Sequence, residues 1–431
     1  MNFVIQEPDF SPLDAKEEFY FMNKESAIRV KVITDEEEFE SLQPAWNALL
    51  ANSPRQDAFM TWEWQFAWWR HFGERYKMQI ITIWQNEELV GIAPLMIMER
   101  RKYGFTFHAL CNFNSPYVDV GGFVFRTGDS ETLFLIFSEI MKLRRYWDSF
   151  EFHGFPIQSA EVVTFSEFFR KADFISYNRI DKYYVIPIEE TWDEYLKKIS
   201  SNLRTDVRRR VKRIREAGEV RFEQLSGEQV RWEHFESIFQ INKYGKFPGL
   251  YQSPQEQAFQ RELFERMQSR IWINFLYLNS APIAFRYGFL YNGRAEDWRN
   301  GYDIRQSQYA PGKVLLYFTL EDVFNRCLKE FDFLLGEETY KARWCADVHK
   351  YVNIRFVWRH NVLAILGLVL WPQLKLAFRN LFKQGESKNA FLRLFRVSGS
   401  SPANCANTLS GHKFSRKLAN KGQNVFMKCD F

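Results

Sequence analysis

The sequence predicts an α/β protein in which one unit, a mixed sheet flanked by helices, occurs twice. Two pairs of similar segments carry this prediction. Residues 87–101 resemble residues 279–294, because in both a short polar turn leads into a strand that begins with small residues. Residues 144–156 resemble residues 328–340, because in both an aromatic residue and an aspartate precede a buried strand and a glycine. Repeated segments at a similar offset are typical of a duplicated unit.

The offsets of the two matches agree closely. Ile283 follows Ile92 by 191 positions, and Asp332 follows Asp148 by 184 positions. A chain of 431 residues is also long enough for two or three hydrophobic cores. We therefore expect five segments: an N-terminal extension (residues 1–26), a first unit (27–185), a second unit (186–359), an apolar and amphipathic helix (360–384) and a disordered basic tail (385–431).

Composition excludes several classes of protein. The net charge is +5, but residues 385–431 alone hold eight Lys and Arg against two Asp and Glu, so the body is not a general polyanion binder. The five cysteines show no CxxC spacing and the histidines no ligand spacing, so we expect no metal site and no disulfide framework. The N-terminus lacks a basic stretch followed by an apolar run, which predicts a cytoplasmic protein.

The most apolar segment is residues 361–372. Its apolar run is roughly half the length needed to span a bilayer. One interpretation is a helix that packs on the core. The other is peripheral attachment to the inner face of a membrane, helped by the basic residues Lys375, Arg379 and Lys383.

The second unit shows its elements in order. Thr191 and Glu194 fit a capping box, and Gly218 ends the helix that it starts. A strand follows, and Asn292-Gly293 is a strong hairpin signal between two further strands. Apolar residues recur along the helix at spacings that predict one buried face, at Leu196, Ile199, Leu203, Val207 and Ile214.

The same helix is strongly basic. Between Lys197 and Arg215 there are nine Lys and Arg residues and one Asp. The stretch could bind RNA or DNA, it could be the solvated face of an amphipathic helix, or it could attract an anionic donor or a membrane-linked substrate. No helix-turn-helix, RNA-recognition or zinc pattern accompanies it, so we do not expect a reader of nucleic-acid sequence.

A polar loop at residues 302–313 leads directly into an apolar helix. The first turn of a helix has unpaired N–H groups and a positive dipole end. Gly312 lets a ligand approach the backbone, and Lys313 adds a positive charge. The loop therefore predicts a phosphate site.

Four segments resemble the tandem form of the GNAT acyltransferases, and in particular the FemAB-like proteins and the CelD-like acetyltransferases of cellulose and exopolysaccharide biosynthesis. The resemblance extends over residues 27–359 and is carried by residues 115–122, 200–222, 284–316 and 331–344. It implies that two strands separate to admit the pantetheine arm of an acyl-CoA, whose diphosphate sits on the next loop. The implied donor is acetyl-CoA or another acyl-CoA, with aminoacyl-tRNA as the alternative, and no metal is needed. The residues implied to hold the cofactor are Arg305, Gln308, Tyr309, Ala310, Gly312 and Lys313.

Transfer of an acyl group to an amine needs a base and donors for the oxyanion. Glu337 and Glu338 follow a buried strand, and they are either the base or an N-cap of the next helix. Asp297 and Arg299 alternate on one strand and should share a face, where they either bind the acceptor or form a cross-strand pair. We list Glu337, Glu338 and Asp297 as catalytic candidates. The candidates for substrate binding are Arg286, Trp298, Arg299, Tyr340 and Lys341, of which Trp298 could also be a core residue.

The first unit has no counterpart of the basic phosphate loop. We therefore expect it to be structural or to help bind the acceptor, an amine-bearing sugar or cell-envelope precursor, in a groove between the units. The predicted function is an N-acyltransferase. The alternatives are a FemAB-like transferase that uses charged tRNA, and a non-catalytic scaffold that docks on a polysaccharide synthase through residues 361–383.

Overall fold

A computed structural model describes residues 19–23, 26–102, 104–113, 120–170, 174–336, 339–345 and 347–371. The predicted basic tail, most of the N-terminal extension, and Glu337 and Glu338 lie outside these residues. The α/β prediction is confirmed. The strands form one continuous mixed sheet that runs through both halves of the chain, in the order β1-β2-β3-β4-β5-β7-β14-β8-β13-β12-β11-β10-β9, with β6 paired to β4.

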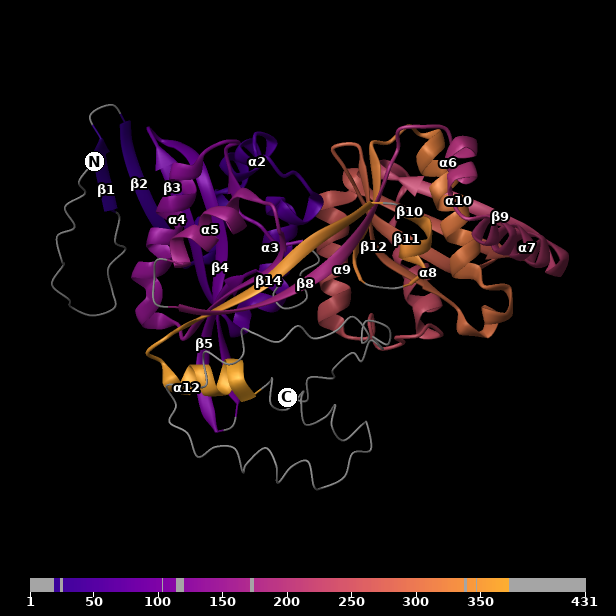
Figure 1. Ribbon diagram of the computed structural model, residues 1–431. Helices are drawn as coiled ribbons and strands as arrows, with labels where there is room; N and C mark the ends of the chain where they lie inside the picture. Colours follow the sequence, from indigo (N-terminus) through magenta and orange to yellow (C-terminus); the bar gives the residue numbers. More distant parts are fainter. Residues whose placement is uncertain are drawn as a thin grey trace, which may run out of the picture. The chain divides into compact units, whose positions relative to one another are not determined.

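The first half supplies one end of this sheet (Figure 1). Its strands are antiparallel except for the parallel pair β5–β7. They are β1 (Phe19–Asn23), β2 (Ser26–Ile33), β3 (Lys77–Gln85), β4 (Glu88–Lys102), β5 (Phe105–Asn112), β6 (Val124–Phe125) and β7 (Ser149–Pro156). The α-helices are α1 (Glu36–Ser41), α2 (Gln43–Ala51), α3 (Trp62–Phe72), α4 (Ser130–Lys142) and α5 (Ala160–Arg170), and a short 3-10 helix, η1 (Ala58–Met60), precedes α3.

The second half supplies the other end, again with one parallel pair, β12–β13. Its strands are β9 (Val220–Ser226), β10 (Ile271–Leu278), β11 (Ala281–Tyr291), β12 (Arg294–Tyr302) and β13 (Glu330–Leu335). Its helices are α6 (Trp192–Lys198), α7 (Ser201–Ala217), α8 (Trp232–Lys243), α9 (Pro254–Met267), η6 (Ile304–Tyr309), α10 (Pro311–Asn325) and α11 (Lys341–Trp344). The chain then continues through α12 (Val362–Ala364) and η7 (Ile365–Leu370).

Two long strands cross from one half to the other (Figure 1). They are β8 (Phe174–Pro187) and β14 (Asp347–Trp358), which pair with each other along their length. On its other side β8 pairs with β13 of the second half, and β14 pairs with β7 of the first. The two halves therefore exchange strands, and residue 185, where we placed the boundary, lies inside β8.

Strand register defines which positions of the two halves correspond. In the first half the parallel ladder ends at the pair Cys111–Glu151, and in the second half it ends at the pair Glu296–Asp332. Each ladder has three residue pairs. The counterpart of Asp332 is thus Glu151, and the alignment with Asp148 was wrong by three positions. Asp148 precedes its strand and accepts a hydrogen bond from the His108 N–H (2.8 Å).

The basic helix predicted from Thr191 to Gly218 is broken into two. The capping box at Thr191 is present, but α6 ends at Lys198 and the Ser200 hydroxyl caps α7. A serine N-cap offers the backbone an alternative to continued helix, which explains the break. The Arg204 guanidinium caps the C-terminal end of α6, since it donates hydrogen bonds to the carbonyls of Leu196 and Lys197, both at 2.7 Å. The predicted apolar face is buried at Leu196, Leu203, Val207 and Ile214.

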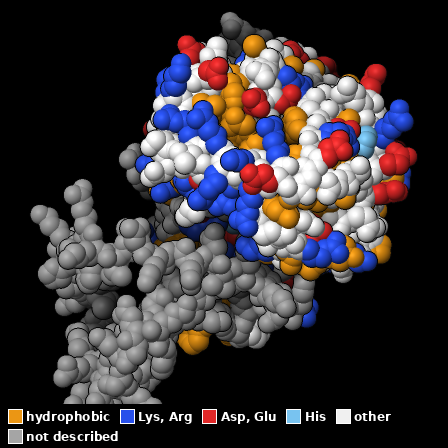
Figure 2. Space-filling model, turned by 90° about the vertical axis from the view of Figure 1, so that its right-hand side faces the viewer, with side chains coloured by type: hydrophobic (Ala, Val, Ile, Leu, Met, Phe, Trp, Pro, Cys, Tyr) orange, Lys and Arg blue, Asp and Glu red, His pale blue; other side chains and the backbone are white. Residues whose placement is uncertain are grey.

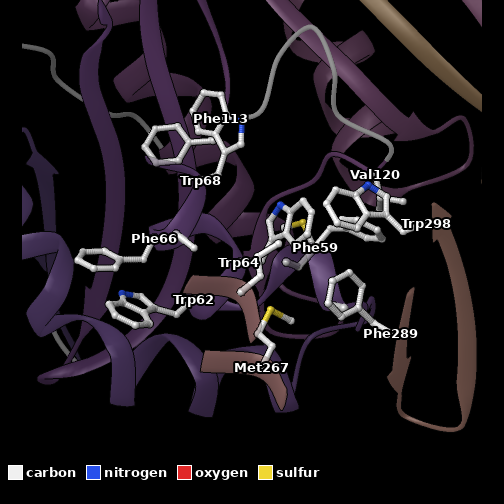
Figure 3. Packing of buried hydrophobic residues seen from close by; sticks show 14 of the residues in the cluster. Phe59, Trp62, Trp64, Phe66, Trp68, Phe113, Val120, Met267, Phe289 and Trp298 are labelled. Carbon is white, nitrogen blue, oxygen red and sulfur yellow. The ribbon is translucent and has the colours of Figure 1, made fainter. Parts of the chain in front are cut away.

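The two halves share a hydrophobic core. Trp64 of α3 and Trp298 of β12 point toward one another, with ring centroids 4.8 Å apart (Figure 3). Phe59 of η1 packs edge-on against Phe289 of β11 at 5.9 Å. Aromatic pairs of this kind add stability beyond their buried area. The first half therefore covers the second-half sheet face that carries Phe289 and Trp298.

Candidate active site

The strands β12 and β13 separate after a short stretch of pairing. Their parallel ladder ends at Glu296 and Asp332, and beyond it no strand among the described residues pairs with that edge of β12. A bulge in β12 lies at the same level, where Gly288 of β11 faces the extra residue. A Cβ at Gly288 would lie 1.8 Å from the Glu296 carbonyl oxygen, so only glycine fits there. The edge of β12 thus offers unpaired backbone groups to a ligand.

Three buried carboxyl groups meet at the root of this split. Glu296 accepts hydrogen bonds from the Ala58 N–H of η1 at 3.2 and 3.3 Å. Asp332 accepts one from the Leu334 N–H at 2.8 Å. Asp57, just before η1, is bound by the Arg55 Nε at 3.2 Å. All three carboxyl groups are at most 3% exposed.

Burial changes the acidity of these groups. It raises the pKa of Asp332 to about 6, although the positive charge of Arg294 opposes the shift. Burial, and then the negative charges of Asp57 and Asp332, raise the pKa of Glu296 well above its usual range. Carboxyl groups that titrate near neutral pH are suited to accept and release a proton.

Glu151, the acid at the corresponding position of the first half, has a lowered pKa instead of a raised one. Glu151 is bound by Arg100 Nη2 at 2.8 Å, by Arg355 Nε at 2.8 Å and by His153 Nε2 at 3.2 Å. Burial would raise the pKa of Glu151, but the His153 hydrogen bond and the two guanidinium charges hold it far below its usual range. Glu151 therefore remains ionised and cannot exchange a proton near neutral pH.

The predicted phosphate loop is only partly as expected. We predicted free backbone N–H groups around Ala310 to Lys313. Instead the Ala310 N–H donates to the Ser307 carbonyl and the Lys313 N–H to the Ala310 carbonyl, both at 3.0 Å. The cause is the 3-10 helix η6, which ends in a left-handed turn at Ala310 (φ 51°). Among the described residues only Gly312 keeps an unpaired N–H in this stretch.

The charged side chains of this loop have partners of their own. Arg305 forms two hydrogen bonds through Nε to the Asp303 carboxylate, at 2.9 and 3.0 Å, and lies 3.5 Å from the centroid of the Tyr244 ring. Lys313 Nζ lies 3.3 Å from Asp206 of α7. Gln308 is exposed, and Tyr309 is half-buried against the core under α10. Both cations remain partly exposed, and an anionic ligand could recruit them.

Three of the predicted site residues lie together: Arg286 and Asp297 form a buried ion pair, and Tyr340 contacts Arg286. The Arg286 guanidinium binds the Asp297 carboxylate through Nε (3.2 Å) and through Nη2, and the Tyr340 hydroxyl also hydrogen-bonds to Arg286. Asp297 thus forms a cross-strand ion pair, with Arg286 as its partner. The β12 bulge places Arg299 on the opposite face, beside the Trp298 ring at 4.5 Å, so the expectation of a shared face was wrong.

Two further candidates are buried. Trp298 belongs to the shared core and is 9% exposed. Lys341 is 3% exposed, and its Nζ donates to the carbonyls of Phe333 and Leu335 at 3.0 and 2.9 Å. The lysine thus fixes the separated end of β13 and has no face free for a substrate. Sequence reasoning missed Glu296 and Asp57 and used Asp332 only to align the two halves. Only the presence of acids in apolar surroundings could have pointed to these three as site residues.

Comparisons with known proteins agree with this architecture. Residues 201–342 match the family model described as an acetyltransferase (GNAT) domain. A crystal structure of FemX superposes with a TM-score of 0.51 at 10% identity, covering 78% of this chain and 98% of that one. L-PGS from Bacillus licheniformis gives 0.48 at 10% identity, covering 77% and 95%, and a tandem GNAT protein from the clavulanic acid biosynthesis pathway gives 0.42 at 10%, covering 76% and 98%. No curated protein is similar enough in sequence to match.

These findings show a GNAT-like α/β fold, and the second half of the chain matches a GNAT acetyltransferase domain. The position of the split between β12 and β13 inside the matched range agrees with that assignment. Among the described residues, no group of three or more His, Cys, Asp or Glu side chains is placed to hold a metal ion. No helix in the part of the chain that the structure describes is long and apolar enough to cross a membrane.

Proposed function

We propose that this protein is an N-acyltransferase that moves an acyl group, by preference acetyl, from acyl-CoA to an amine. The observation that carries the proposal is the split between β12 and β13 with proton-accepting carboxyl groups at its root. The pantetheine arm would lie along the unpaired edge of β12, and its reactive thioester would end beside Glu296 and Asp332. The Gly312 N–H and the side chains of Lys313 and Arg305 are the groups available for the diphosphate.

The chemical step needs a base at that root. The amine nitrogen attacks the acyl carbon, a C–N bond forms, and the C–S bond breaks. Asp332 takes the proton of the attacking amine and returns it to the leaving thiolate. Its pKa of about 6 leaves it ionised at neutral pH and still basic enough to act. Burial is the main cause of this raised pKa, and the negative charge of Glu330 adds to it. Glu337 and Glu338 stay candidates for the same role.

A second candidate donor is aminoacyl-tRNA, and one surface favours it. On α7 the side chains of Arg208, Arg209, Lys212, Arg213 and Arg215 are exposed, and Figure 2 shows Lys and Arg gathered on this end of the molecule. Arg208, Lys212 and Arg215 line a groove between α7 and α10 together with Tyr317 and Phe318. Cations beside aromatic rings suit the phosphates and bases of a single-stranded RNA end.

Calorimetry with acetyl-CoA and with desulfo-CoA tests the choice of donor. We expect binding that Lys313→Ala weakens about tenfold, since it removes one phosphate contact of about 1.4 kcal/mol. We expect a similar loss in Gly312→Ala, which keeps the N–H but adds a Cβ, 3.3 Å from the Tyr302 ring, where the diphosphate would approach. Gly249→Ala and Lys182→Ala are matched controls, because a Cβ at Gly249 meets no atom within 4 Å and Lys182 is exposed on the distant strand β8. Absence of binding to either CoA, with retention of charged tRNA, would favour the second donor. Absence of both would leave the scaffold interpretation.

For the acceptor we propose an amine on a sugar or on another cell-envelope precursor, in cellulose, exopolysaccharide or envelope synthesis. The support is the resemblance of the sequence to enzymes of those processes. Precursors of this kind are built at the inner face of a membrane, so the proposal includes a cytoplasmic protein held there.

The surface around α12 supports membrane attachment. Ala364 and Leu368 pack on Phe107 and Val357. On the outer side Val362, Leu363 and Leu366 are 61%, 54% and 50% exposed, and Phe105 from the β4–β5 hairpin is 49% exposed. Arg144, stacked 3.3 Å over the Trp358 ring, lines a pocket beside Val362 and Leu363. Exposed apolar side chains next to cations are typical of a helix that lies on an anionic bilayer.

We expect the protein to sediment with phosphatidylglycerol vesicles and less with phosphatidylcholine vesicles. The double variant Leu363→Glu/Leu366→Glu should bind at least about tenfold less, because two leucines no longer enter the apolar layer. Phe134→Glu/Val163→Glu is the control, since those side chains are 53% and 52% exposed on α4 and α5. Equal loss in both variants, or none in either, would count against attachment through α12.

A further inference from the structure

A set of buried polar atoms near the split has no hydrogen-bond partner among the described residues. The atoms are Tyr251 Oη, Tyr287 Oη, Arg299 Nε, Trp64 Nε1 and Gln260 Oε1. They come from α3 of the first half and from α9, β11, β12 and the segment before α9 in the second half. Tyr287, Tyr251 and Gln260 are 0%, 3% and 0% exposed.

The set is contiguous. The Tyr287 and Trp298 rings are 5.4 Å apart, and Trp298 is 4.8 Å from Trp64 and 4.5 Å from the Arg299 guanidinium carbon. Arg299 also affects the pKa of both Tyr251 and Tyr287, which places the three polar groups in one region. Figure 3 shows Trp64 near the middle of the packed aromatic side chains, with Phe59 and Trp298 to one side of it.

Such a concentration of unpaired polar atoms is unusual. Most buried polar groups in proteins have a partner, because an unpaired one loses its hydrogen bonds to water without replacement. Neighbouring core residues follow the rule, since Trp46 Nε1 donates to the Met60 carbonyl and Trp62 Nε1 to the Phe39 carbonyl, both at 2.9 Å. The unpaired set therefore indicates a partner that arrives from outside the chain.

The set lies on the same face of the sheet as Glu296. Arg299 stands opposite Tyr287 in the ladder, and Glu296 stands opposite Phe289, two residues further along β11 on the same face. Glu296 pairs with Asp332 at the root of the split. A substrate whose amine reaches Asp332 would thus extend its remaining groups toward Arg299.

The chemistry of the set is rich in hydrogen-bond donors. Arg299 and Trp64 can only donate, and the two tyrosine hydroxyls can donate, whereas Gln260 Oε1 accepts. Glu256 is close enough to affect the pKa of both tyrosines, and its carboxylate accepts a hydrogen bond from Gln260 Nε2 at 3.0 Å. Several donors around one guanidinium match a carboxylate.

We propose that Arg299, Tyr251, Tyr287 and Trp64 bind a carboxylate of the acceptor, so that the acceptor is an amine that also carries a carboxylate. This inference rests on the proposed N-acyltransferase function and names its substrate class. It assigns Arg299 a role that differs from that of Asp297, its neighbour on the other face. Tyr251 and Tyr287 are specificity residues in this scheme and take no part in proton transfer.

Matched pairs of acceptors test the inference directly. Acetyl transfer is measured with tyrosine against tyramine and with muramic acid against glucosamine, and we expect the carboxylate-bearing member of at least one pair to have at least tenfold higher kcat/KM. Loss of that preference is expected in Arg299→Met. If transfer occurs to all four amines without preference, the inference is wrong while the acyltransferase survives. If no acetyl-CoA binds and none is consumed, the proposed function itself fails.

The variants Tyr251→Phe and Tyr287→Phe separate a ligand site from buried water. For a ligand site, each raises the KM of the preferred acceptor at least about fivefold, leaves kcat and acetyl-CoA affinity unchanged, and raises the melting temperature, because an unpaired hydroxyl is removed. Tyr277→Phe is the control, since the Tyr277 hydroxyl donates to Glu223 at 2.7 Å and its loss should lower stability without changing KM. A lower melting temperature with unchanged KM in Tyr251→Phe and Tyr287→Phe would show hydroxyls paired to structural water and would overturn the proposal.

Discussion

Replacing Asp297 with leucine is expected to lower the free energy of unfolding by about 3–5 kcal/mol. The carboxylate is the buried partner of Arg286, whose side chain is 3% exposed. Without it the guanidinium keeps its charge in an apolar layer, with only the Tyr340 hydroxyl left among the contacts found for it. Denaturant unfolding followed by circular dichroism measures the loss, and calorimetry of the folded variant reports whether donor binding is retained.

The double variant Arg286→Met/Asp297→Leu separates structure from catalysis. Replacing both members of a buried ion pair by apolar side chains of similar size is often neutral or stabilising. We therefore expect the double variant to regain most of the stability that Asp297→Leu loses. If acyl transfer returns with stability, the ion pair serves only to hold β11 against β12. If stability returns without transfer, the prediction that Asp297 or Arg286 acts on the substrate is correct.

The sequence identified the elements whose formation depends on local residues. The capping box at Thr191 and the hairpin at Asn292-Gly293 are both present, with positive φ at Asn292 (49°) and Gly293 (80°). The repeated unit was also visible, because two copies keep the same order of turn, strand and helix. These features need only neighbouring residues, and so a single sequence contains them.

Features that depend on distant residues could not be predicted. Strict alternation put Asp297 and Arg299 on one face, but the bulge opposite Gly288 adds a residue and turns them to opposite faces. The exchange of β8 and β14 between the halves has no local signal, since it depends on pairing between strands that lie more than 150 residues apart in the sequence. Glu296 is buried because η1 of the first half donates a backbone N–H to it across 238 residues of sequence.

The duplication allows the two halves to be compared at one backbone position. At the last pair of the parallel ladder the first half has Cys111–Glu151, and the second half has Glu296–Asp332. Three basic groups saturate Glu151, whereas Asp332 faces a second acid and a single nearby arginine, Arg294. The same backbone position thus has opposite shifts of pKa. In our interpretation the first copy has converted it to a structural ion pair and the second keeps it reactive.

The variant Asp332→Asn is expected to lose activity and gain stability. Because Asp332 is the proposed general base, its replacement should lower kcat about 100- to 10,000-fold. In the folded protein the pKa of Asp332 is raised to about 6, above its value in the unfolded chain. The native state therefore binds a proton more tightly than the unfolded state. As the pH rises from about 4 through 6, this proton is lost and the buried carboxylate destabilises the fold. Above pH 7 this cost is about 3 kcal/mol. Asp332→Asn should therefore be about 2–3 kcal/mol more stable than the wild type at pH 8 and equally stable at pH 4. The wild-type kcat/KM should fall below about pH 6.

The variant Glu151→Gln is the matched control, and its stability should change in the opposite direction. The pKa of Glu151 is depressed in the fold, so its carboxylate stabilises the protein above the unfolded pKa and this contribution is lost as the pH falls through acid values. At pH 8 the change leaves Arg100 and Arg355 without their anion, and we expect a loss of about 3–5 kcal/mol. Its kcat at a temperature where it stays folded should equal that of the wild type. Two observations would refute the assignment: full activity in Asp332→Asn, which would return the base to Glu337 and Glu338, or loss of stability at pH 8 in that variant, which would show a paired carboxylate at the root of the split.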